Sequence, residues 1–117
     1  MKKFAIGLIL ALPFLAILST VTSAATKTLN GEIMDSQCAL LGGHDKMIHE
    51  GQTEKECTLA CVAIGGKFVL FDPATKSTYQ LDDQKKASAF AGAKVKVTGD
   101  YNDSTKTIKI AKIEKGA

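Results

Sequence analysis

The chain has no arginine and no tryptophan, and only two of its 117 residues are proline. All 15 basic residues are therefore lysines, and two of them, Lys2 and Lys3, lie at the very start. Without those two, 13 lysines stand against 12 acidic residues, so the rest of the chain is nearly neutral. Nucleic-acid-binding proteins need clustered positive charge, and arginine gives their bidentate phosphate contacts. The composition therefore argues against binding of nucleic acid.

Short catalytic motifs are also missing. The sequence has no glycine-rich phosphate loop and no serine elbow. Its three cysteines include neither the Cys-x-x-Cys of thioredoxin-like redox centres nor the Cys-x-x-Cys-His of covalent haem attachment. We therefore expect a binding module rather than an enzyme, with a thiol-redox role as the alternative.

The first 24 residues have the three parts of a secretory signal peptide. Lys2 and Lys3 give the positive start, residues 4–18 form an apolar run, and small residues follow up to Ala24. An apolar run of about 15 residues is shorter than the roughly 20 needed to span a bilayer. We expect cleavage near Ala24, export to the periplasm or the medium, and no membrane attachment afterwards. Residues 25–117 then form one domain.

Over the full chain, 45% of the residues are hydrophobic and 23% are charged. In the expected mature part, apolar and polar residues alternate as they do in β-strands. The sequence Asp72-Pro73 predicts a turn between two of the strands. A short helix that ends at Gly92 is expected before the last two strands. The step from Ile110 to Ile113 breaks the alternation and predicts a β-bulge near Ala111. Strands are expected over 28–35, 67–72, 77–81, 94–101 and 107–114.

The order of these elements is strand, long connection, strand, strand, helix, strand, strand, which is the order of an OB-fold barrel. The closing segment Val95–Asp100 also resembles the final hairpin of small exported bacterial OB-fold proteins. We therefore expect a mainly β protein, a small OB-fold-like five-stranded barrel with one or two short helices. A simple meander packed on one helix is the alternative.

The long connection, residues 36–66 between the first and second strands, holds all three cysteines and both histidines. Connections of this length are usually functional or contain their own elements. A capping-box pattern at Thr53 and Glu56 predicts a helix from about Glu54 to Ile64. A further short turn of helix is expected within residues 42–51.

Two interpretations of the cysteines remain open. Cys57 and Cys61, at i and i+4 on the expected helix, are placed to share a metal ion, and Cys38 and His44 would complete a Cys₃His set. Such a set suits zinc, and with Met47 and His49 nearby it also suits Cu(I). Exported cysteines more often form disulfides, here from Cys38 to one cysteine of the helix or between molecules.

The spacing of these residues resembles that of a group of small exported bacterial proteins without assigned activity. The shared pattern is Asp-Ser-x-Cys, here Asp35 to Cys38, then His44, then Cys-x₃-Cys-Val at Cys57 to Val62, then a strand led by Gly66. The resemblance covers most of the mature chain. It implies that Cys38, His44, Cys57 and Cys61 act as one constellation, and it implies no reaction.

Overall fold

The structure, a computed structural model, describes residues 25–116 together with residues 7, 13, 16 and 17. Most of the expected signal peptide, including the residue before the expected cleavage, lies outside the described residues, so export stays a prediction. Within the described part of the chain, no helix is both long enough and apolar enough to cross a membrane.

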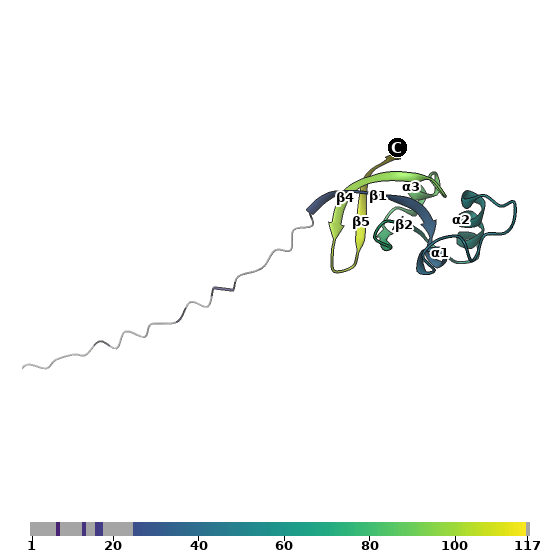
Figure 1. The fold of residues 1–117 in the computed structure, drawn as a ribbon. Helices are drawn as coiled ribbons and strands as arrows, with labels where there is room; N and C mark the ends of the chain where they lie inside the picture. Colours follow the sequence, from purple (N-terminus) through teal and green to yellow (C-terminus); the bar gives the residue numbers. More distant parts are fainter. Residues whose placement is uncertain (1–6, 8–12, 14–15, 18–24, 117) are drawn as a thin grey trace, which may run out of the picture.

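Five strands close into a barrel in the order β1-β2-β3-β5-β4 (Figure 1). Neighbouring strands pair antiparallel except β3 and β5, which are parallel. This architecture confirms the OB-fold-like, mainly β barrel expected from the sequence. The strands are β1 (Ala25–Asp35), β2 (Phe68–Asp72), β3 (Ser77–Leu81), β4 (Lys94–Asn102) and β5 (Thr107–Lys115).

Three short helices accompany the barrel. The segment between β1 and β2 contains α1 (Ser36–Leu40) and α2 (Glu54–Ala63), and α3 (Gln84–Ser88) lies between β3 and β4. Figure 1 shows α1 and α2 together at one end of the barrel, away from the turn between β4 and β5. The sequence did not predict α1. Residues 42–51 form hydrogen-bonded turns rather than a helix, including one helical bond from Ile48 N to the His44 oxygen at 2.9 Å.

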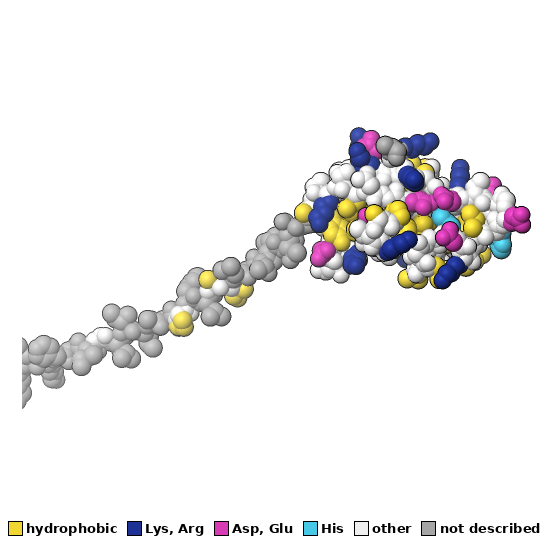
Figure 2. Space-filling model, in the orientation of Figure 1, with side chains coloured by type: hydrophobic (Ala, Val, Ile, Leu, Met, Phe, Trp, Pro, Cys, Tyr) yellow, Lys and Arg dark blue, Asp and Glu magenta, His cyan; other side chains and the backbone are white. Residues whose placement is uncertain are grey.

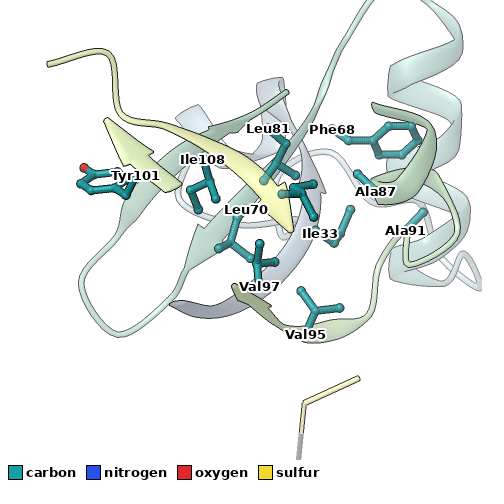
Figure 3. Close-up of a cluster of buried hydrophobic side chains, with 11 residues drawn as sticks. Ile33, Phe68, Leu70, Leu81, Ala87, Ala91, Val95, Val97, Tyr101 and Ile108 are labelled. Atoms are coloured by element: carbon teal, nitrogen blue, oxygen red, sulfur yellow. The ribbon is translucent and has the colours of Figure 1, made fainter. Parts of the chain in front are cut away.

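The inside of the barrel is filled by alternate residues of the strands. Ile33 of β1 is paired in register with Leu70 of β2, and both are fully buried. Figure 3 shows their side chains among those of Leu81, Val97 and Ile108, all pointing into the same space. The expected bulge is confirmed, because β4 pairs Thr98 with Lys112 and Gly99 with Ile110, which leaves Ala111 as the extra residue.

A second buried cluster lies on the outer face of β1 and β2. Because side chains alternate along a strand, Met34 and its partner Val69 point away from the barrel interior. Residues 36–66 cover this face, so the two strands are buried on both sides where they pair. The cluster consists of Met34, Cys38, Ala39, Cys57, Cys61, Val69 and Phe71, with Ile48 packed against it.

Candidate metal centre

The three cysteines come together in this outer cluster. Cys38 lies on α1, Cys57 and Cys61 lie on α2, and all three are buried with relative exposures of 0%, 2% and 7%. Their Sγ atoms lie within 4.8 Å of one another. All three thiols are free, although the Sγ atoms of Cys38 and Cys57 are only 3.9 Å apart.

The start of α2 fixes the direction of its two cysteines. The Glu56 amide donates to Thr53 Oγ1 at 3.1 Å, and the Thr53 amide donates to Glu56 Oε2 at 3.3 Å. This reciprocal pair is the capping box expected from the sequence, and it satisfies two backbone donors at the helix start. With the start fixed, the i, i+4 spacing turns Cys57 and Cys61 toward the barrel.

The position of Cys38 depends on Asp35, the last residue of β1. Asp35 caps α1, because its Oδ2 atom accepts hydrogen bonds from the amides of Gln37 at 3.1 Å and Cys38 at 2.9 Å. The Ser36 amide also donates to the Lys67 oxygen at 2.8 Å, which ties the start of α1 to the residue before β2. The turn from β1 into α1 therefore holds Cys38 over the outer face.

His44 reaches the cluster from the loop after α1. Its side chain is 6% exposed, and its Nε2 atom lies 2.9 Å from Oε1 of Glu32, a residue on the outer face of β1. An ionised carboxylate accepts the hydrogen of Nε2, and in the neutral tautomer with that hydrogen Nδ1 is the nitrogen with a free lone pair. Nδ1 is buried and has no hydrogen-bond partner.

All four residues of the expected Cys₃His set thus lie in one region, with His44 on the side of Cys38. Asp35, Cys38 and His44 form a second group whose ligand atoms lie within 4.8 Å of one another, so Cys38 belongs to both groups. A third such group, Glu32, His44 and Glu54, lies closer to the surface. In Figure 2, acidic and histidine side chains gather at the end of the molecule that carries the helices α1 and α2.

Three buried polar atoms in this region lack a hydrogen-bond partner: Asp35 Oδ1, His44 Nδ1 and Thr58 Oγ1. Buried polar groups are normally paired, and an unpaired one costs about 1–3 kcal/mol. Two of the three atoms are good metal ligands beside Cys38. A bound cation would give both of them a partner.

Asp35 and Glu32 are not among the ligands expected from the sequence. Asp35 had a local signal, because an aspartate three residues before Cys38 is typical of a helix cap. Glu32 had none, because its role depends on a loop residue that only the fold brings to it. Thr58 follows Cys57 on α2 and carried no signal either.

The electrostatics of the cluster favour the protonated form of the Cys38 and Cys61 thiols. Burial, followed by the hydrogen bond and negative charge of Asp35, raises the pKa of Cys38 far above its usual range. Burial and then the charge of Asp35 also raise the pKa of Cys61. Reactive redox cysteines have a lowered pKa and partial exposure. These two thiols have neither property.

The distance between the Cys38 and Cys57 sulfurs is compatible with both being bound to one metal ion. Zn–S bonds of about 2.3 Å place two sulfurs of a tetrahedron about 3.8 Å apart. The Cys38–Cys57 separation of 3.9 Å is close to that distance. A disulfide requires an S–S distance of about 2.05 Å, so the two side chains would have to move together.

Of the side chains that would favour copper, two lie at the surface and one is buried. Met47 is 38% exposed, and His49 is also exposed. Met34 is buried and fills the core of the outer cluster. A thioether therefore lies in the same buried cluster as the three thiols.

No family model matches this chain, and neither does any curated protein or solved structure in the comparisons made. The resemblance of the Cys/His pattern to small exported bacterial proteins therefore stays an expectation. What is established for this chain is an OB-fold-like barrel with a buried cluster of three cysteines and one histidine that could hold a metal ion.

Proposed function

We propose that this protein is an exported metal-binding module rather than an enzyme. Cys38, Cys57 and Cys61 supply three thiolates, and His44 adds its Nδ1 atom. Zinc and Cu(I) are the two ions that such a sulfur-rich set suits. Such a site could serve metal storage, delivery or sensing, or the ion could stabilise the structure of residues 36–66.

One observation supports the proposal most strongly. Three free thiols from two separate helices lie within 4.8 Å of one another. One of them, Cys38, also lies within 4.8 Å of a ring nitrogen of His44, whose Nδ1 atom is buried without a partner. Hydrophobic packing alone does not require an unpaired imidazole nitrogen beside thiols, since leaving it unpaired costs free energy. A metal ion would bind the sulfurs and the nitrogen together.

The experiment is metal analysis of the protein purified from the periplasm of a bacterial host. We expect about one equivalent of zinc or copper, and three titratable thiols after acid release of the metal. Cys61→Ser should abolish metal binding. Ile64→Ser changes a 76% exposed residue just after the same helix and should bind metal as the unmodified protein does. Absence of metal from the purified protein, together with failure to bind added Zn²⁺ or Cu(I), would contradict the proposal.

A disulfide-stapled interaction domain is the second candidate, and the closeness of Cys38 and Cys57 favours it. Oxidation of this pair would link α1 to α2 and leave Cys61 as a single free thiol. The same purified protein distinguishes the two candidates. A stapled domain would show one titratable thiol, a mass two hydrogens lower and no metal, and Cys61→Ser would leave its bridge intact.

A further inference from the structure

We infer that Asp35 is one of the four ligands that a tetrahedral ion takes from this cluster of five groups, and that it makes the centre selective for a divalent ion, Zn²⁺, over Cu(I). The inference rests on the proposed metal-binding function and specifies which ion the site prefers. It begins from the environment of one carboxylate, since the three sulfurs by themselves suit both ions.

Asp35 is completely buried, with 0% exposure. One of its oxygens, Oδ2, accepts two amide hydrogen bonds from the first turn of α1, and the other, Oδ1, accepts none. Among the described residues, no lysine forms an ion pair with Asp35. A buried carboxylate is normally paired with a cation or with a full set of donors, because burial of an unpaired charge is costly. Oδ1 has neither.

The Asp35 carboxylate belongs to the same group as Cys38 and His44. One carboxylate oxygen of Asp35 and the ligand atoms of Cys38 and His44 lie within 4.8 Å of one another. Because Oδ2 is already occupied by the helix amides, Oδ1 is the oxygen available to an ion. The helix cap holds the carboxylate in place through Oδ2.

The chemistry of this oxygen separates the two candidate ions. Carboxylates bind Zn²⁺ at about 2.0–2.2 Å, together with thiolates and imidazoles. Cu(I) prefers thiolates and thioethers, and a carboxylate adds little to its binding. A divalent cation also compensates more of the negative charge that Asp35 and the thiolates bring into the buried cluster. The Asp35 oxygen therefore favours Zn²⁺.

The test compares Zn²⁺ and Cu(I) affinities of the full mature chain with those of Asp35→Asn, using chelator competition. Asparagine is as good a helix cap as aspartate, so α1 should persist while the charge is lost. We expect the Zn²⁺ affinity to fall at least about tenfold, by analogy with losses at metal sites, while the Cu(I) affinity changes less than about twofold. Asp45→Asn makes the same chemical change at an exposed position next to His44 and should alter neither affinity.

The outcomes are separable. If the unmodified protein binds neither ion, the proposed function fails. If it binds metal and Asp35→Asn keeps its Zn²⁺ affinity, or loses Cu(I) affinity equally, only the inference about Asp35 is wrong. If Asp35→Asn does not fold, Asp35→Ser retains a capping oxygen and takes its place.

In either variant, the visible absorption bands of the Co²⁺-substituted protein should shift from those of the unmodified chain. Unchanged bands would contradict ligation by Asp35.

Discussion

Glu32 and His44 are joined by a contact of 2.9 Å between Oε1 and Nε2, and this contact leaves Nδ1 as the imidazole nitrogen without a partner. Glu32 comes from the barrel and His44 from the loop after α1. A carboxylate that holds the far nitrogen of a metal-binding histidine is common at metal sites, where it fixes the ring and its tautomer. Burial is the main reason why the pKa of Glu32 is raised, and the hydrogen bond from His44 opposes that rise.

Replacement of Glu32 by alanine should weaken Zn²⁺ binding about 10–100-fold, because the imidazole loses the group that orients it. Glu32→Gln keeps an oxygen that accepts from Nε2 and should recover part of the loss. Titration with a competing chelator measures both variants. Glu50→Ala, at an exposed position, serves as the control. Equal affinities for Glu32→Ala and Glu50→Ala would show that Glu32 does not position His44.

Metal affinity should rise with pH between about pH 6 and 8, because binding must displace protons from the thiols. Burial raises the pKa of Cys38 and of Cys61, so both thiols are protonated throughout this range. Each proton displaced raises the affinity about tenfold per pH unit, so these two thiols together raise it about 100-fold per pH unit. Chelator competition at several pH values, corrected for the chelator's own protonation, tests the slope. A flat profile would mean that the thiols are not the ligands.

Gly92→Ala should destabilise the protein more than Gly51→Ala does. Both glycines have positive φ angles, 73° and 79°, which cost an alanine about 1–2 kcal/mol. A Cβ on Gly92 would also overlap the backbone of Lys55 on α2, whereas a Cβ on Gly51 meets nothing within 4 Å. We expect an additional loss of about 1–3 kcal/mol for Gly92→Ala. Urea unfolding of the metal-free proteins measures the difference, and equal midpoints would contradict a close contact between α2 and Gly92.

Zinc should slow amide hydrogen exchange mainly in α1 and α2. The ion would join Cys38 of α1 to Cys57 and Cys61 of α2, which otherwise meet through a few buried contacts. The barrel core around Ile33 and Leu70 is closed without metal and should change little. Exchange measured by mass spectrometry, with and without Zn²⁺, tests this expectation. Uniform protection across the whole chain would indicate instead that the ion stabilises the barrel as a unit.

The sequence was sufficient for the barrel because each of its elements has a local signal. Strand alternation, the Asp72-Pro73 turn and the break in pattern at Ala111 each depend on neighbouring residues, and the structure confirms all three. The α2 helix was predictable for the same reason, since Thr53 and Glu56 form its capping box. The short α1 helix was missed, because five residues give too little periodicity for a helix to be recognised.

The sequence by itself determined the strand order and the start of α2, and it predicted a set of three cysteines and one histidine. Only the tertiary structure decided what surrounds them: an outward-facing Glu32 that holds His44, and a buried Asp35 with one oxygen left free. The physical reason is that metal ligation and burial depend on distances between segments far apart in the chain. Local patterns of residues specify elements, whereas the environment of a side chain is set by how those elements pack.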